Sequence, residues 1–155
     1  MKKLKLGMVG GGQGAFIGGV HRIAARMDDR WELVSGALSS NKERAKVSAD
    51  EIGLVRSYSS FEEMAKVESS LEDGIDAVSI VTPNNVHSAP VVAFLNAGIH
   101  VICDKPLAAT MEQANQISES VEKSEARFFL THNYTAYPLI RQAQKLVKEG
   151  ALGRI

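Results

Sequence analysis

The stretch "VGGGQGAFIGGVHR", Val9–Arg22, decides the fold, because five of its first ten residues are glycine. A short apolar run precedes it, and a segment with helical spacing of apolar residues follows it. The fingerprint of a dinucleotide-binding turn is G-x-G-x-x-G between a strand and a helix. Gly10 and Gly12 fill the first two positions, Ala15 stands at the third, and Gly18 follows three residues later. We therefore predict a phosphate-binding turn rather than a flexible loop.

The rest of the chain alternates between apolar, strand-like runs and segments of helical periodicity. The expected strands are Leu4–Gly10, Trp31–Leu38, Val55–Ser59, Ile75–Thr82, Ile99–Asp104 and Arg127–His132. The expected helices are Phe16–Met27, Asn41–Gly53, Phe61–Leu71, Pro83–Gly98, Met111–Glu125 and Tyr137–Gly150, with N-caps at Asn41, Ser60 and Thr110. This alternation predicts an α/β protein with a Rossmann-type, doubly wound parallel sheet of about six strands and helices on both faces.

Composition narrows the class of protein. The chain has 155 residues, 45% of them apolar and 23% charged, which is typical of a globular domain. Lys and Arg (18) balance Asp and Glu (18), so neither nucleic acid nor an anionic membrane is expected as the main partner. The single cysteine, Cys103, excludes an intramolecular disulfide framework, and no spacing of ligands indicates a metal site. Because no signal peptide or membrane-length apolar run is recognisable, we expect a cytoplasmic protein.

The glycine-rich turn is expected to bind a pyrophosphate, because the N–H groups and the dipole of the following helix favour an anion. The residues of this turn expected to contact the cofactor are Gly10, Gly12, Gln13, Gly14, Ala15, Phe16 and Ile17.

The end of the second strand bears on the choice between NAD and NADP. An acidic residue there would bind the ribose hydroxyls, but this chain has Ser39 and Ser40, followed by Lys42 and Arg44. Hydroxyls and a cation suit a 2′-phosphate, so Ser39, Ser40 and Arg44 are expected cofactor contacts and NADP is slightly favoured over NAD. The alternative, that Lys42 and Arg44 are only solvated charges on a helix, stays open.

Two further motifs stand at strand ends: "VTPNNVH", Val81–His87, after the fourth strand and "CDKP", Cys103–Pro106, after the fifth. Together they resemble the Gfo/Idh/MocA oxidoreductases, typified by glucose-fructose oxidoreductase and inositol dehydrogenase, and the resemblance runs from Leu4 to the chain end. It implies that Lys105 is the catalytic residue, which hydrogen-bonds the substrate hydroxyl and helps to move its proton. It also implies a cis Lys105–Pro106 peptide bond.

The resemblance further implies a set of residues along the cofactor. They are Thr82, Pro83, Asn84, His87, Asp104, Lys105 and Pro106. For His87, a local role at the start of a helix is an almost equally good interpretation. Neither His21 nor His132 is assigned a role, and His100 is expected to be structural.

Three features depart from the family pattern. Asp104 is shorter than the usual glutamate, and Thr135 stands where many members have an arginine. If Gly18 is aligned with the family's third glycine, the turn carries three extra residues, with Phe16 and Ile17 at its tip. The enlarged rim would then cover the nicotinamide side.

The resemblance implies an NAD(P)-dependent oxidoreductase that transfers hydride between nicotinamide and a sugar, inositol or related polyol. Residues 1–150 would form the NAD(P)-binding domain, and residues 151–155 would begin a second, substrate-binding domain. The isolated chain is therefore expected to show little turnover, and the full-length protein is expected to form homo-oligomers. The alternative function is a non-catalytic nucleotide-binding regulator or sensor. A methyltransferase is a weaker interpretation, because it explains neither the Ser-Ser tip nor the "DKP" motif.

Overall fold

The structure, a computed structural model, describes residues 2–154 and contains the expected parallel sheet. Its strands are β1 (Leu4–Gly10), β2 (Trp31–Ala37), β3 (Arg56–Ser57), β4 (Ala77–Val81), β5 (His100–Cys103) and β6 (Phe128–Leu130). All neighbouring pairs are parallel, in the order β3-β2-β1-β4-β5-β6. The predicted Rossmann-type architecture is confirmed.

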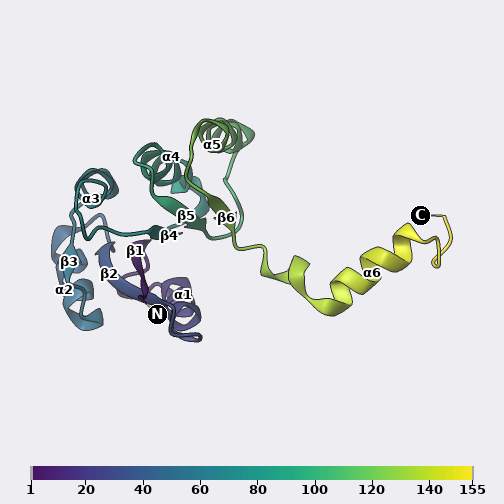
Figure 1. Cartoon of the computed structure of the whole chain (residues 1–155), viewed down its shortest axis with the longest axis horizontal. Coiled ribbons are helices and arrows are strands. Elements are labelled where there is room, and N and C mark those ends of the chain that lie inside the picture. The colour runs from purple at the N-terminus through teal and green to yellow at the C-terminus, as the bar shows by residue number, and fades with distance from the viewer. Residues whose placement is uncertain (1, 155) are drawn as a thin grey trace.

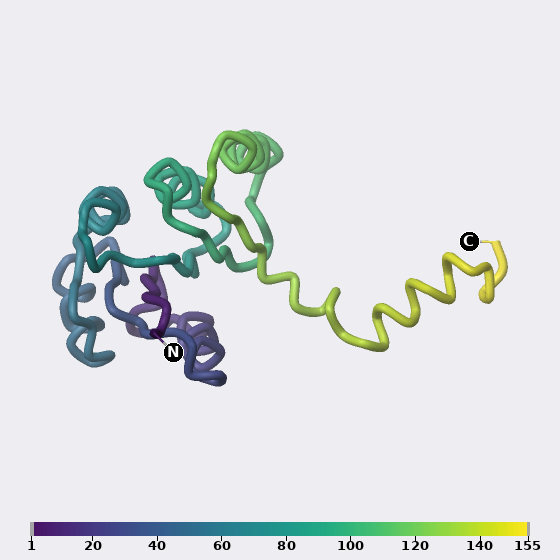
Figure 2. Tube along the Cα trace, in the orientation of Figure 1, coloured from purple at the N-terminus to yellow at the C-terminus, as the bar shows by residue number. Residues whose placement is uncertain are grey.

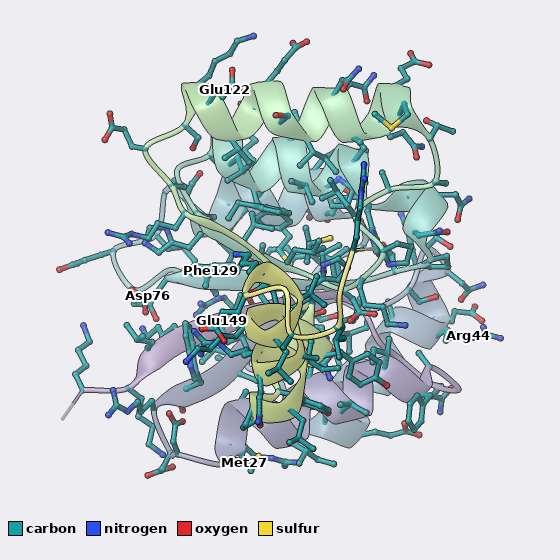
Figure 3. The ribbon with its side chains drawn as sticks, turned by 90° about the vertical axis from the view of Figure 1, so that its right-hand side faces the viewer. Met27, Arg44, Asp76, Glu122, Phe129 and Glu149 are labelled. Carbon is teal, nitrogen blue, oxygen red and sulfur yellow. The ribbon has the colours of Figure 1, made fainter. Side chains whose placement is uncertain are left out.

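Helices cover both faces of this sheet (Figure 1). On one side lie α1 (Phe16–Arg26) and α2 (Lys42–Ile52), and on the other lie α3 (Phe61–Glu68), α4 (Ser88–Asn96) and α5 (Met111–Lys123). The same layers appear edge-on in Figure 3, with α4 and α5 above the sheet and α1 and α2 below it. All five residues of β4 are buried because helices and two neighbouring strands enclose it, as its continuous apolar run predicts.

From β1 the chain continues to β2 and β3 on one side of the sheet, and from β4 it continues to β5 and β6 on the other. The switch point, where this direction reverses, therefore lies between β1 and β4. The register aligns the carboxyl ends of the strands: Gly10 pairs with Val81, and Ile80 pairs with Cys103. On the far side, Cys103 pairs with Leu130. The loops that follow β1, β4, β5 and β6 therefore meet at one edge of the sheet, where ligands bind in folds of this kind.

Three helices begin where the sequence predicts a side-chain cap. Asn41 Oδ1 accepts a hydrogen bond from the backbone N–H of Arg44 at 2.9 Å. The hydroxyl oxygens of Ser60 and Thr110 accept from the N–H groups three residues ahead, at 3.2 and 3.3 Å. Each cap satisfies a donor that the helix itself cannot bond.

Several elements are shorter than the sequence predicts: β6 covers only Phe128–Leu130, and α3 ends at Glu68. The third strand is only two residues long, because it lies at the edge of the sheet and pairs with β2 alone. The predicted helix Pro83–Gly98 is divided into a 3₁₀ turn, Asn84–Val86, and α4, which begins at Ser88. Pro90 explains the late start: it has no N–H to donate to Val86, so it is tolerated only in the first turn of the helix.

A buried ion pair joins β3 to α3. Arg56 donates from Nε and Nη2 to the two carboxylate oxygens of Glu68, at 2.8 and 2.9 Å. The Tyr58 hydroxyl and the Ile75 backbone N–H donate to the same carboxylate, at 2.8 and 3.2 Å. The Glu68 side chain is fully buried. Its carboxylate oxygens accept hydrogen bonds from all of these partners, and such bonds are needed to offset the cost of burying a charge.

The last helix, α6 (Pro138–Lys148), extends away from the packed body (Figures 1 and 2). None of its residues is buried, and Leu139 and Ile140 are 77% and 51% exposed. The packed body therefore ends close to β6, and the helices on both faces of the sheet are α1 to α5. Phe129 on β6 is also exposed, at 54%. Within residues 2–154, no helix has the length and apolar character needed to cross a membrane.

Candidate functional site

The glycine-rich turn connects β1 to α1 in a conformation that only glycine adopts without strain. Gly10, Gly11 and Gly14 have φ values of 78°, 76° and 78°, in the region that disfavours residues with a Cβ. Gly12 is required for a different reason, because a Cβ there would lie 2.8 Å from both the Leu38 carbonyl oxygen and the Ser48 hydroxyl. The turn thus passes directly against the end of β2 and the side of α2.

Gly18 performs the packing role of the third glycine. A Cβ at Gly18 would lie 2.4 Å from Gly11 Cα and 2.8 Å from the Gly11 carbonyl oxygen. The first turn of α1 can approach the glycine-rich turn this closely only without a side chain at position 18. Ala15, the third position of the strict fingerprint, is instead the N-cap residue of α1. The alignment through Gly18, with a longer turn before it, is the one that the packing supports.

The start of α1 is suited to an anion. Its N-cap Ala15 makes no side-chain cap, and its first turn holds no acidic residue, in contrast to the capped α2, α3 and α5. Two preceding N–H groups anchor the turn: Gly12 donates to the Leu38 carbonyl at 3.3 Å, and Gln13 donates to Ser48 Oγ at 3.0 Å. The first-turn N–H groups of α1 are therefore left to bind a phosphate, with the helix dipole favouring its charge.

A crevice of about 650 Å³ opens beside this turn, at the switch point between β1 and β4. The predicted cofactor residues that line it are Gly10, Gly12, Gln13, Ala15, Ser39, Ser40, Arg44, Thr82 and Pro83. The Thr82 hydroxyl is buried and has no hydrogen-bond partner among the described residues. An unpartnered hydroxyl, an uncapped helix and a glycine turn that excludes Cβ atoms together fit the polar groups of a dinucleotide.

The remaining predicted residues lie elsewhere. A second cavity of about 640 Å³, between α1 and the ends of β5 and β6, is lined by Phe16, Ile17, Asp104 and Lys105. Gly14 lies in a smaller hollow on the outer side of the turn. The predicted site is thus divided between a crevice with the features of a nucleotide site and a cavity that holds the proposed catalytic lysine.

The segment Asp104–Pro106 directly follows β5. The Lys105–Pro106 peptide bond is cis, as predicted, and the Lys105 side chain is exposed. The carboxylate of Asp104 accepts a hydrogen bond from the Thr131 hydroxyl at 2.8 Å and lies 3.3 Å from His21 Nε2. Burial alone would raise the pKa of Asp104, but hydrogen bonds from Thr131, His21 and the Lys105 backbone N–H outweigh it and hold the pKa below its usual value. A carboxylate therefore stands next to Lys105.

His87 is placed differently from the expectation that it lines the cofactor. Its side chain is buried, at 1% exposure. Nε2 lies 2.8 Å from the Thr82 carbonyl oxygen, and Nδ1 lies 3.0 Å from the Pro106 carbonyl oxygen. Both ring nitrogens are thus occupied by the backbone, and the structure supports the local interpretation: His87 connects the loops after β4 and β5. Asn84 and Pro106, likewise expected along the cofactor, line neither of the two larger cavities described above.

Several residues of the site were not identified from sequence. His21 and Thr131 hold Asp104, while Arg22 donates from Nη1 to the Gly11 carbonyl at 2.9 Å and Ser48 accepts from Gln13. His21 and Arg22 follow the glycine-rich turn by little more than one helical turn, which is the signal that could have pointed to them. Thr131 and Ser48 have no such signal, because their role depends on contacts between distant segments.

The described part of the chain contains no cluster of three or more side chains that could hold a metal ion. Cys103 lies buried in β5, where burial and the neighbouring Asp104 raise the pKa of its thiol to about 12. Such a thiol is neutral and packs as a small apolar group.

Comparison with known proteins identifies the family of the chain. Residues 4–132 match the family described as "Oxidoreductase family, NAD-binding Rossmann fold". Levoglucosan dehydrogenase of Pseudarthrobacter phenanthrenivorans is 32% identical over 100% of this chain and 40% of its own length. The chain thus spans about two fifths of the length of the curated relatives it first matches.

Solved structures give the same result. An oxidoreductase from Sinorhizobium meliloti is 55% identical, with a TM-score of 0.88 over 97% of this chain and 42% of the other. An inositol dehydrogenase homologue from Azotobacter vinelandii, solved in complex with NAD+, is 36% identical, with a TM-score of 0.88 over 99% of this chain and 40% of the other.

Proposed function

Because the chain belongs to the Gfo/Idh/MocA family of oxidoreductases, which has an NAD-binding Rossmann fold, we propose that it is the nucleotide-binding part of an NAD(P)-dependent dehydrogenase. Its substrate would be a sugar, inositol or related polyol, as the names of the levoglucosan and inositol dehydrogenase relatives suggest. The observation that carries the proposal is that the glycine-rich turn and Lys105 follow strands of one sheet whose carboxyl ends are aligned. Residues 1–150 would be the NAD(P)-binding domain, and a second domain would complete the substrate site.

In this proposal the nicotinamide supplies the hydride chemistry, and the protein supplies binding, orientation and proton transfer. The first-turn N–H groups of α1 bind the pyrophosphate, and the Thr82 hydroxyl gives a polar contact in the crevice. Lys105 hydrogen-bonds the hydroxyl of the substrate and takes up its proton during oxidation.

We further propose that NADP is preferred over NAD. Ser39 Oγ accepts the Asn41 backbone N–H at 3.2 Å, which leaves its hydroxyl proton free to donate to a 2′-phosphate. Arg44 lies in the first turn of α2, at the edge of the molecule in Figure 3, and lines the crevice. Lys42, in the same turn, does not line it. Arg44→Ala is therefore expected to weaken NADPH binding about tenfold and to leave NADH binding unchanged, with Lys42→Ala as the matched control. Tighter binding of NADH than of NADPH by the unmodified chain would contradict the preference.

The activity is tested with a full-length protein that contains this chain, incubated with NAD+ or NADP+ and a panel of polyols while absorbance at the reduced nicotinamide band is followed. Lys105→Ala is expected to lower kcat by at least about a hundredfold and to leave the dissociation constant of the cofactor unchanged. The 155-residue chain alone is expected to bind cofactor with little turnover. Unchanged turnover in Lys105→Ala would refute the catalytic assignment. Cofactor binding without turnover by the full-length protein on every polyol would favour the alternative, a nucleotide-binding regulator or sensor.

A further inference from the structure

Four side chains from four different elements form one hydrogen-bonded row beside Lys105. Ser79 lies on β4, His21 on α1, Asp104 after β5 and Thr131 after β6. His21 Nδ1 is 2.8 Å from Ser79 Oγ, His21 Nε2 is 3.3 Å from Asp104 Oδ1, and the Thr131 hydroxyl donates to the same Oδ1 at 2.8 Å. The side chains of His21 and Asp104 are only 11% and 13% exposed, so water competes little for these contacts.

An imidazole with a single ring proton is enough for His21 to make both of its contacts, with Ser79 and with Asp104. A proton on Nε2 lets His21 donate to the Asp104 carboxylate, and the bare Nδ1 then accepts the hydroxyl proton of Ser79. The carboxylate of Asp104, which can only accept, thus fixes the tautomer with the proton on Nε2, and the Ser79 hydroxyl complements it by donating to Nδ1. The Ser79 hydroxyl has no other hydrogen-bond partner in the part of the chain that the structure describes.

The order Ser, His, Asp is also that of a hydrolase triad, but the burial of Ser79 excludes that role. Ser79 lies in the middle of β4, where it is 1% exposed and pairs in register with Met8 and Ile102 on the neighbouring strands. Although Ser79 borders the cavity of Lys105, its near-complete burial within the strand does not give a substrate carbonyl the open approach that a nucleophile needs.

The row connects the two halves of the site through α1. This helix begins at the glycine-rich turn, and Arg22 holds the turn by donating to the Gly11 carbonyl at 2.9 Å. The residue before it, His21, holds Asp104, the neighbour of Lys105. Asp104 is fixed on its other side by its backbone N–H, which donates to the Ile80 carbonyl at 2.9 Å. One short segment of α1 therefore contacts both the turn and the end of β5.

We propose that His21 is a positioning residue: by donating to Asp104, it fixes the backbone at Lys105 relative to the glycine-rich turn. The inference rests on the proposed function, because the position of Lys105 matters for hydride transfer only if Lys105 is catalytic. A small displacement of a group that must meet the substrate is costly, since reaction requires the two to be closely aligned.

Two amide variants separate this role from simple packing. The amide nitrogen of His21→Gln can take the place of Nε2 and still donate to Asp104, whereas the shorter His21→Asn replaces Nδ1 and reaches only Ser79. Both variants put a neutral amide at the same position of α1. In a full-length protein that contains this chain, we expect His21→Asn to lower kcat about tenfold with little change in the KM of the cofactor, and His21→Gln to stay within about threefold of the unmodified protein.

Asp104→Ala completes a double-mutant cycle, because it removes the oxygen that accepts from His21. In the Asp104→Ala protein, His21→Asn should lower kcat little further, because the contact that it would break is already absent. Equal kcat values for His21→Gln and His21→Asn, or additive losses in the cycle, would overturn the proposal.

A measurement that does not depend on turnover tests the positioning role of His21 independently of the proposed function. The backbone amide of Lys105 can be followed by ¹H–¹⁵N NMR in the 155-residue chain itself. We expect its resonance to shift in His21→Asn and to stay near its original position in His21→Gln. If the unmodified full-length protein transfers no hydride, the proposed function fails, yet this pattern would still support the positional role. A Lys105 resonance that moves equally in both His21 variants would refute it.

Discussion

Two adjacent glycines of α1 offer a sharp test of how the glycine-rich turn is built. A Cβ at Gly18 would lie 2.4 Å from Gly11 Cα, whereas a Cβ at Gly19 would meet only the end of the Arg22 side chain, at 3.8 Å. Gly18→Ala and Gly19→Ala therefore make the same chemical change, one position apart in the same helix, in opposite steric surroundings.

The expected change in unfolding free energy follows from these contacts. Carbon atoms normally approach to about 3.5–4.0 Å, so in Gly18→Ala the helix or the turn must move by more than about 1 Å. The atoms in the way belong to the backbone of Gly11, which cannot rotate aside. Overpacking of this kind costs about 3 kcal/mol, offset by about 1 kcal/mol from the better helix propensity of alanine. Gly18→Ala should thus lose about 2 kcal/mol of unfolding free energy, or about 4–8 °C in Tm, and Gly19→Ala should gain up to about 1 kcal/mol.

The assay combines urea unfolding, followed by circular dichroism, with NADH titration, followed by fluorescence, on both variants and the unmodified chain. Because the displaced turn carries the N–H groups expected to bind pyrophosphate, Gly18→Ala should also weaken NADH binding at least about tenfold, while Gly19→Ala should bind normally. Equal stability and equal affinity of the two variants would refute the idea that α1 and the turn are in contact at Gly18.

Two other perturbations test the core and the crevice. Glu68→Gln should lower the unfolding free energy by about 2–3 kcal/mol in urea titrations, because it replaces the buried carboxylate of the ion pair with Arg56 by a neutral amide and leaves the guanidinium only the more exposed Asp73 as a charged partner. Burial would raise the pKa of Glu68, but hydrogen bonds from Arg56 and Tyr58 hold it below its ordinary value of 4.5. The stability that ionised Glu68 contributes is therefore present above pH 4.5 and lost as the pH falls through the lower folded pKa; a difference between the unmodified protein and Glu68→Gln that grows on acidification would contradict this sign. Thr82→Val removes the unpartnered buried hydroxyl, so it should leave stability unchanged or raise it by up to about 1 kcal/mol while weakening NADH binding about threefold or more; unchanged affinity in a fluorescence titration would exclude Thr82 as a cofactor contact.

Much of the site could be predicted because it depends on local pattern. The glycine-rich turn and the three side-chain caps each involve residues close in sequence, and the structure contains all of them. The cis Lys105–Pro106 bond, which the family resemblance implied, is also present. The late start of α4 was missed although Pro90 carries its signal, since the apolar run continues through the proline.

The histidines show where local pattern fails. His87 and His21 both stand near helix starts; the family resemblance implied a cofactor role for His87, with a local role almost equally favoured. In the structure His87 is buried with both ring nitrogens against backbone carbonyls, while His21 faces the cavity of Lys105 and contacts Asp104 across 83 positions of sequence. Which histidine faces a cavity depends on how the helices lie on the sheet, and periodicity carries no information about that.

The amino-acid sequence by itself determined the alternation of strands and helices, the position of the turn that lacks side chains, and the family to which the chain belongs, because these properties follow from short-range spacing and from motifs. Tertiary structure alone decided that Gly18 packs on Gly11, that the predicted site divides into two cavities, and that His21 and Thr131 hold Asp104. The reason is physical: these contacts join segments that the order and register of parallel strands bring to one edge of the sheet.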